Sequence, residues 1–300
     1  RKAGDPERRL AADGNEWKSS GQMQAQPAEH LVDEFAPVVG DPYHFARGGG
    51  VVLDRLQVAA VRILERRGRL KAAGARDEEV LVATKWWPLF RTAGNLRRTI
   101  QERLDCLEGY SIGLYQVHQP FSFSTPEAEM EAMAALVQAG KIRSVGVSNF
   151  SAQRMRRAHA ALAKYGIPLA ANQVYYSLLN RKIETDGILE TARQLGVTII
   201  AYTPLAAGLL SGKYHQDPAL LQRSGLVKRA RFARRIERTR PVVEALLEMA
   251  PRYGATAAQV ALNWLIHAHG ELVVTIPGAT KVHQAQDAAG AMRFRLAEED

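Results

Sequence analysis

Several polar residues that are suited to acid–base chemistry or ligand binding follow short apolar runs in the sequence. They are Lys85, His118, Ser148, Asn149, Gln173, Tyr202 and Thr203. A lysine or a histidine that stands alone in such a place is ordinarily a surface charge or a structural side chain. Here such residues recur at the corresponding ends of five successive runs, and barrel enzymes place their active sites at the carboxyl ends of their strands. The pattern therefore predicts one shared site.

Six short apolar runs, rich in β-branched residues, are typical of buried parallel strands. They cover residues 80–87, 112–120, 142–149, 169–177, 197–205 and 272–279. The stretches between them have the spacing of amphipathic helices, as Leu96 and Ile100 illustrate. Thr125 and Pro126 are suited to the start of one helix, and Gly196 to the end of another.

This alternation predicts an α/β fold with a parallel sheet. No GxGxxG motif follows a strand, which disfavours a dinucleotide-binding doubly wound sheet, so we expect a (β/α)8 TIM-type barrel. Six units are two short of that barrel, so we expect its first one or two strands to be atypical or missing. The barrel domain is predicted over residues 51–300, with a helix from about Leu53 to Ala73. Residues 1–50 form an atypical segment that we expect to be poorly ordered.

The 300 residues carry 40 basic and 31 acidic side chains, a net charge of +9. Much of the excess lies between Leu221 and Arg240, either as a solvated helix face or as a groove for anionic phosphates. No interleaved aromatic residues accompany these charges, so we expect no nucleic-acid partner. No apolar run approaches the length of a membrane span, so we expect no membrane partner. The single cysteine, Cys106, excludes an internal disulfide and a cysteine-based metal cluster. We expect no metal and a cytoplasmic location, with a plastid as the alternative.

Seven segments in unbroken order, over roughly residues 60–300, resemble the successive signatures of the aldo-keto reductases. They are VLVATK, LYQVHQP, GKIRSVGVSNF, NQVYYSLLNR, IAYTPLAAGLLSGKY, AQVALNWL and IPGATK. The resemblance implies a (β/α)8 barrel, NADP(H) as cofactor, and hydride transfer to or from a small aldehyde or ketone.

Two catalytic residues are implied by the resemblance. Lys85 matches the lysine that lowers the pKa of a catalytic tyrosine, because a fixed ammonium favours the phenolate. His118 matches the histidine that orients and polarises the carbonyl.

The resemblance also implies where the cofactor binds. Ser148, Asn149 and Gln173 match the groups that hold the nicotinamide carboxamide, and Tyr202 matches the aromatic residue that stacks on the nicotinamide ring. The pyrophosphate and adenosine contacts fall at Thr203, Leu205, Lys213, Ile276, Gly278, Thr280, Lys281, Gln284 and Asp287. Asp287 stands where the family usually has a glutamate.

The resemblance fades where the family places an aspartate and its catalytic tyrosine, upstream of Lys85. Tyr43, in GDPYHFA, and Asp54, in VVLDRL, do not match that pattern. Either a sequence or gene-model error has replaced this stretch, or the protein is a natural degenerate relative. Without that acid we expect severely reduced activity, since general acid catalysis contributes roughly 10²–10⁴-fold.

Three functions follow as alternatives. The first is an NADP(H)-dependent reductase of aldehydes or ketones, and the second is a non-catalytic NADP(H)-binding regulatory subunit, which the missing tyrosine favours. The third is a barrel aldolase that uses Lys85 as a Schiff-base nucleophile. The nicotinamide-site matches argue against the third. Neither the substrate nor the oligomeric state is predicted.

Overall fold

The computed structural model of the chain describes residues 74–300, except 108, 224–225 and 280. All of them belong to one compact unit, residues 40–300. The predicted segment 1–50 and the predicted helix from Leu53 to Ala73 lie outside the described residues, as do Tyr43 and Asp54.

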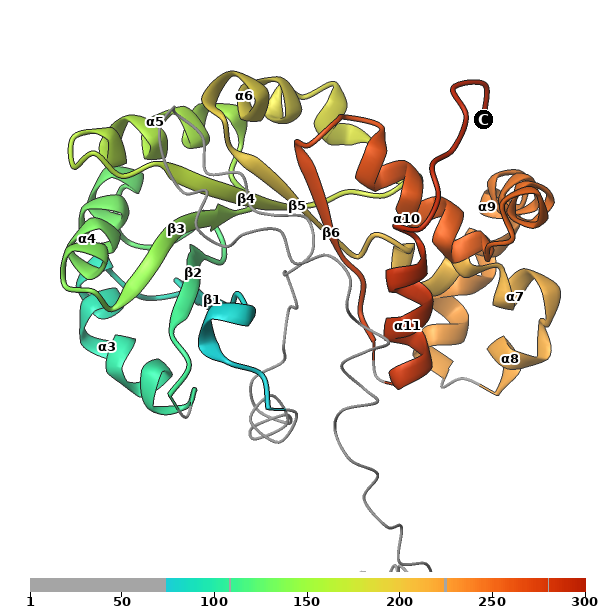
Figure 1. The fold of residues 1–300 in the computed structure, drawn as a ribbon, viewed down its shortest axis with the longest axis horizontal. Helices are drawn as coiled ribbons and strands as arrows, with labels where there is room; N and C mark the ends of the chain where they lie inside the picture. Colours follow the sequence, from blue (N-terminus) through green and yellow to red (C-terminus); the bar gives the residue numbers. More distant parts are fainter. Residues whose placement is uncertain (1–73, 108, 224–225, 280) are drawn as a thin grey trace, which may run out of the picture. The chain divides into compact units, whose positions relative to one another are not determined.

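The described residues form a parallel sheet of six strands in chain order, β1-β2-β3-β4-β5-β6 (Figure 1). The strands are β1 (Ala83–Trp86), β2 (Ile112–Val117), β3 (Ile142–Ser148), β4 (Leu169–Tyr175), β5 (Thr198–Tyr202) and β6 (Val273–Ile276). Each predicted apolar run contains one of them, so this prediction is confirmed. Any barrel strand before β1 would fall mostly or wholly outside the described residues.

Helices connect the strands. After β1 to β4 come α3 (Ala93–Asp105), α4 (Pro126–Gln138), α5 (Ala152–Ala163) and α6 (Ile188–Leu195). These four cover the outer face of the sheet (Figure 1). Short 3-10 turns are η1 (Asp77–Glu79), η2 (Lys182–Glu184), η3 (Ala206–Ser211) and η4 (Ala250–Tyr253). The remaining helices are α7 (Lys213–Gln216), α8 (Ala219–Gln222), α9 (Leu226–Met249), α10 (Ala257–His267) and α11 (Val282–Gly290).

Two predicted helix boundaries are confirmed by their capping contacts. The Thr125 hydroxyl accepts a hydrogen bond from the backbone N–H of Ala128 at the start of α4, and Pro126 is the first helical residue. Gly196 ends α6 with a φ of 66°, a left-handed conformation that glycine adopts without a Cβ penalty.

The side chains of the strands alternate between two cores. Tyr115, Val117 and Val147 belong to the large core between the sheet and its helices. Leu114 and Ile200 belong to a smaller cluster on the inner face. Because successive side chains of a strand point to opposite faces, this division fixes which strand residues can reach an inner site.

The basic stretch predicted between Leu221 and Arg240 lies largely on α9. Arg234 and Arg238 are exposed, and Arg240 pairs with Glu237 over 2.9 Å. At these positions the run is a solvent-facing helix surface. No helix among the described residues combines the length and apolar character that crossing a bilayer requires.

Candidate functional site

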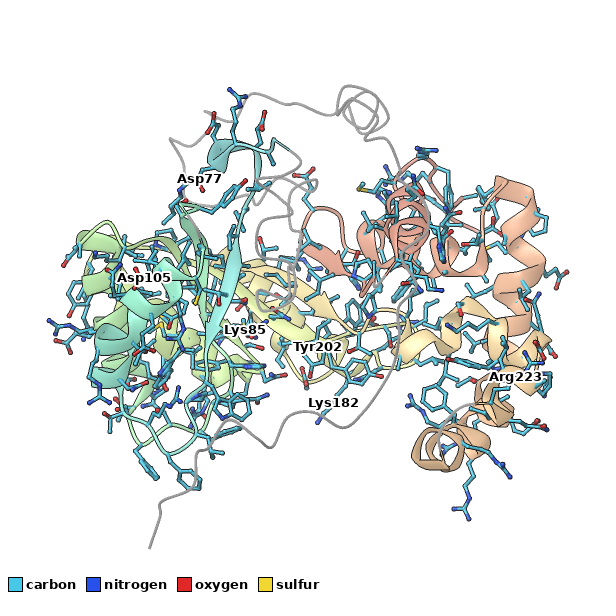
Figure 2. All side chains as sticks on the ribbon, turned by 90° about the horizontal axis from the view of Figure 1, so that it is seen from below. Asp77, Lys85, Asp105, Lys182, Tyr202 and Arg223 are labelled. Atoms are coloured by element: carbon cyan, nitrogen blue, oxygen red, sulfur yellow. The ribbon has the colours of Figure 1, made fainter. Side chains whose placement is uncertain are left out.

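The inner face of the sheet carries the predicted site residues directly beyond its apolar layer. The inner cluster contains Ala83, Leu114, Ala171, Ile200 and Val274. Two residues further along the same strands come Lys85, Gln116, Gln173, Tyr202 and Ile276. A two-residue step in a strand keeps the same face, so these side chains follow the inner core toward the carboxyl ends of the strands. Figure 2 labels Lys85 on β1 and Tyr202 at the end of β5.

Lys85 and His118 lie together on the first two strands. Lys85 is the second-to-last residue of β1, one position earlier than a strand end, and His118 directly follows β2. The backbone N–H of His118 donates to the Trp86 carbonyl over 3.0 Å. Burial lowers the pKa of the Lys85 ammonium. Burial and then the charge of Lys85 lower the pKa of His118, which favours a neutral imidazole beside a cation.

Asn149 joins four strands through hydrogen bonds. Its backbone N–H donates to the Gln173 carbonyl over 2.9 Å. Its side-chain Nδ2 donates to the His118 carbonyl over 3.3 Å and to Ser148 Oγ over 3.1 Å. Its Oδ1 accepts from the Tyr202 hydroxyl over 3.1 Å. The structure therefore brings together the ends of β2, β3, β4 and β5, as the sequence predicted.

The side chains of Gln173 and Tyr202 differ in the contacts that they make within the protein. Gln173 is 7% exposed, and its side chain makes no hydrogen bond within the part of the chain that the structure describes. Its backbone carbonyl accepts from Ser148 Oγ over 2.8 Å. The Tyr202 ring stacks on Tyr175, with centroids 5.6 Å apart and planes 17° apart. A mostly buried amide with free donors and an acceptor is suited to a polar ligand.

The backbone is left-handed at two of the predicted site residues. Asn149, directly after β3, has a φ of 60°, and Thr203, directly after β5, has a φ of 54°. Left-handed backbone is uncommon for a residue with a Cβ atom, and for a β-branched threonine it is a true outlier. Such conformations cost roughly 1–3 kcal/mol each and cluster at functional sites.

The residues predicted for the pyrophosphate and adenosine lie on the segments after β5 and β6. Leu205 caps η3, Lys213 begins α7, and Ile276 ends β6 with Gly278 in the loop that follows. Because Tyr202 and Ile276 are register partners, the two segments begin side by side.

The contacts of this second set are partly made within the protein. Lys213 Nζ lies 5.0 Å from the centroid of the Tyr214 ring. Lys281 precedes α11, as predicted, and its backbone N–H donates to Gln284 Oε1 over 3.2 Å. Asp287 Oδ1 accepts from the Thr256 hydroxyl over 3.1 Å. Thr280 lies outside the described residues.

Four aromatic side chains, which we call the aromatic rim, lie in the loops that follow β1 and β2. They are Trp87 and Phe90, after β1, and Phe121 and Phe123, after β2. Trp87 contacts His118 and Phe121 edge-on, with centroids 5.0 and 5.8 Å away. The Phe90 and Phe123 rings lie 6.0 Å apart and are 77% and 71% exposed. The rim presents an apolar surface at the carboxyl end of the sheet.

Sequence reasoning missed the rim, Gln116 and Tyr175. Gln116 is fully buried opposite Lys85 in the strand register, and its Nε2 donates to the Val147 carbonyl over 3.3 Å. Its Oε1 has no partner among the described residues. The alternation of each strand could have found both residues, because each lies two residues from a predicted site residue.

Several tyrosine hydroxyls of the described region lie in other contacts, away from Lys85. The Tyr110 hydroxyl donates to the Ala75 carbonyl, and the Tyr253 hydroxyl donates to the carboxylate of Asp300. The Tyr176 hydroxyl is hydrogen-bonded to Glu184 and to His269. The Tyr115 hydroxyl is buried without a partner in this region. No tyrosine hydroxyl among the described residues is hydrogen-bonded to Lys85.

Comparison with known proteins identifies the family of this chain. The chain matches the Aldo/keto reductase family over residues 63–300. It is 33% identical over 230 residues to the chloroplastic pyridoxal reductase of Arabidopsis thaliana, covering 75% of this chain and 61% of that protein. It is 36% identical over 207 residues to the aldo-keto reductase str7 of Strobilurus tenacellus, covering 67% and 58%. The chain thus spans about three fifths of the length of these two relatives.

A solved structure is similar as well. It is a thermostable aldo-keto reductase in complex with the inhibitor epalrestat, with a TM-score of 0.60 and 31% sequence identity, covering 77% of this chain and 71% of that one. The six parallel strands and their helices are accordingly those of a (β/α)8 TIM-type barrel. This chain belongs to the aldo-keto reductase family.

Proposed function

We propose that this chain is an NADP(H)-dependent oxidoreductase that reduces small aldehydes or ketones to alcohols by hydride transfer. The observation that carries the proposal is the hydrogen-bonded group of His118, Asn149 and Tyr202 beside Lys85, at the carboxyl ends of adjacent strands. That end of a β/α barrel is where active sites lie.

The residues fit the cofactor. When bound, NADP(H) supplies or accepts the hydride. The Gln173 amide, mostly buried and without a protein hydrogen bond in the described part of the chain, matches the needs of a carboxamide, and Ser148 and Asn149 lie beside it. We assign the ring of Tyr202 to stacking on the nicotinamide. Further contacts are proposed from Thr203, Leu205, Lys213, Ile276, Gly278, Thr280, Lys281, Gln284 and Asp287.

His118 is the residue that would bind the carbonyl oxygen. Since burial and Lys85 lower its pKa, it is neutral at neutral pH and keeps one N–H to donate. Lys85 adds positive charge near the oxygen, where negative charge develops during reduction. The described residues contain no assigned proton donor for the product oxygen. Turnover is therefore expected to fall short of that of a complete site by roughly 10²–10⁴-fold.

Aromatic aldehydes are the first substrates to test. The aromatic rim offers ring contacts next to His118, and the Arabidopsis relative is named as a pyridoxal reductase. Pyridoxal carries its aldehyde on a flat heteroaromatic ring of the kind that such side chains stack against. We propose a cytoplasmic location; a plastid is the alternative, which is supported by the name of that relative as chloroplastic.

The test is a titration of the protein with NADPH, followed by tryptophan fluorescence, and then a turnover assay. Saturable binding and NADPH oxidation that requires pyridoxal or benzaldehyde are expected, and Lys85→Met should remove the oxidation. NADPH should bind more tightly than NADH, because Lys213 and Lys281 add positive charge on the segments proposed to bind the cofactor phosphates. Equal affinities would contradict the NADP(H) assignment, and absence of binding would contradict the whole proposal.

A non-catalytic NADP(H)-binding regulatory subunit is the second candidate. It is favoured by the tyrosine hydroxyls of the described residues, since none of them is hydrogen-bonded to Lys85. Saturable NADPH binding without turnover of any aldehyde tested would select this function over the first.

A further inference from the structure

Glu129 is a buried carboxylic acid that has no part in the proposed reaction. It lies in the first turn of α4, and only 1% of its surface is exposed. Burial raises its pKa to about 7. The hydrogen bond with Ser122 and the charge of Arg154 on α5 lower this pKa, and the charge of Glu127 on α4 raises it. A position near a helix N-terminus favours a carboxylate, so burial outweighs that effect here.

The partner of Glu129 is Ser122, in the loop of residues 118–125 between β2 and α4. Ser122 Oγ lies 2.5 Å from Glu129 Oε1. The other carboxyl oxygen, Oε2, is buried and has no partner among the described residues. Burying a charged carboxylate oxygen without a hydrogen bond costs more free energy than burying the carbonyl oxygen of a neutral acid.

The contacts of the Ser122 hydroxyl indicate whether Glu129 carries a proton. A hydroxyl has one donor and two acceptor positions. Ser122 Oγ accepts from the Ser124 backbone N–H over 3.0 Å and donates to the Ser124 carbonyl over 3.1 Å. Its remaining position is an acceptor, so the third contact is satisfied only if Glu129 is protonated and donates. With Glu129 ionised, Ser122 would turn its proton toward Glu129, and the Ser124 carbonyl would lose its donor.

The same loop is tied to the loop after β1. The Ser124 hydroxyl accepts from the Ala93 backbone N–H over 2.9 Å. The Phe123 backbone N–H donates to the Arg91 carbonyl over 2.9 Å. The loop begins at His118 and carries half of the aromatic rim, so its conformation sets how the rim and the imidazole face each other.

We propose that Glu129 is a positioning residue: its proton lets Ser122 bond Glu129 and the Ser124 carbonyl at the same time, and this clasp stiffens the loop of residues 118–125 where it meets the loop after β1. The clasp is complete while Glu129 is neutral; as Glu129 ionises with rising pH, the bond between Ser122 and Glu129 remains, but the Ser124 carbonyl loses its donor. Its effect on turnover rests on the proposed reductase function; the clasp itself does not.

The test compares Glu129→Gln, Ser122→Ala and the native chain. Glutamine keeps the shape of the neutral acid and its amide donates to Ser122 at every pH. Protection factors for the Phe123 and Ser124 amides are measured by hydrogen exchange across pH 5 to 9, and Glu131→Gln, at an exposed position of α4, is the matched control. In the native chain protection is expected to fall about fivefold as pH rises through the pKa, the worth of one hydrogen bond.

Glu129→Gln should keep full protection at high pH, Ser122→Ala should lose it at every pH, and Glu131→Gln should follow the native chain. A Glu129→Gln profile that falls with pH as the native one does would overturn the proposal. Should that variant fail to fold, infrared spectroscopy of the native chain decides: a protonated carboxyl band at pH 6, changed by Ser122→Ala, is expected, and its absence would refute the clasp.

These measurements need neither cofactor nor turnover. If the chain reduces aldehydes, kcat/KM should fall with pH in the native chain and stay level in Glu129→Gln, while Glu131→Gln matches the native chain. Absence of turnover would count against the reductase function alone, whereas a pH-independent loop would count against the clasp alone.

Discussion

The hydroxyl of Tyr202 donates a hydrogen bond to Oδ1 of Asn149 over 3.1 Å, and this bond crosses over β4. Tyr202 ends β5 and Asn149 follows β3, so the bond links two strands that are not neighbours in the sheet. It also fixes the side-chain amide of Asn149, with the oxygen toward Tyr202 and the nitrogen toward Ser148 and the His118 carbonyl.

Tyr202→Phe should weaken NADPH binding modestly. The ring keeps its stacking on Tyr175, but Asn149 loses one hydrogen bond, worth about 1 kcal/mol or roughly a fivefold rise in Kd. Tyr202→Ala loses the ring as well and should weaken binding further. Fluorescence titration with NADPH measures both. Equal Kd values for native and Tyr202→Ala proteins would remove Tyr202 from the cofactor site.

Lys85→Met should raise the pKa of His118. The charge of Lys85 is one of the two causes that lower this pKa, and the variant removes that charge while burial remains. The imidazole signals of His118 in NMR spectra, followed across pH, report the change. His215 is the internal control, because the causes that lower its pKa do not include Lys85. An unchanged His118 titration would mean that the two side chains do not interact.

Phe123→Ala should raise KM for benzaldehyde or pyridoxal about fivefold and leave kcat nearly unchanged. The aromatic rim reaches His118 through Trp87, and Phe123 belongs to the loop that begins at His118; one aromatic contact is worth roughly 0.5–1.5 kcal/mol. Tyr165→Ala is the matched control, since Tyr165 is also exposed but follows α5, at the opposite ends of the strands. Steady-state kinetics measure both variants. Equal effects of the two substitutions would contradict a role for the rim.

The opposite end of the sheet should matter for stability instead. Asp77 accepts hydrogen bonds from the Ser111 backbone N–H and hydroxyl, over 2.7 and 2.8 Å, and pairs with Arg143. Figure 2 places Asp77 and Lys85 apart along the segment that contains β1. Asp77→Ala should lower the free energy of unfolding by about 2 kcal/mol, measured in urea, with NADPH affinity unchanged. Arg143→Ala removes only an exposed ion pair and should cost about 1 kcal/mol or less.

Glu129 should also make stability depend on pH. Its folded pKa, about 7, lies above the value of about 4.3 for an unfolded chain. Its contribution is therefore fully present below about pH 4 and is lost as pH rises through about 7. The loss should approach about 4 kcal/mol, from 1.36 kcal/mol for each of the roughly 2.7 units between the two pKa values. Urea unfolding of the native chain and of Glu129→Gln across this pH range isolates the contribution of Glu129 to the free energy of unfolding. If the unfolding free energies of the two proteins change with pH in parallel, this contribution is contradicted.

Sequence reasoning succeeded where local pattern and chemistry agree. The six strands, the start of α4 at Thr125 and the polar residues after the strands all follow from apolar spacing and residue type. The convergence of His118, Asn149 and Gln173 follows in turn, because parallel strands bring their carboxyl ends to one edge.

What depends on distant partners was not predictable from one sequence. Glu129 is one of several acids in PEAEMEAM, and only the fold of the preceding loop over it makes it buried. The left-handed backbone of Thr203 runs against the propensity of a β-branched residue, so only tertiary context holds it. The predicted absence of a matching catalytic tyrosine and aspartate concerns residues outside the described part of the chain, so it stays a prediction.

The strained turns at Asn149 and Thr203 set a limit on how this protein can be improved by mutation. Glycine at either turn would release the Cβ strain, so a screen for heat resistance alone would favour it. At position 149 glycine would also delete the amide that ties four strands together. Selection for thermal stability and selection for nucleotide binding would thus favour different residues at position 149.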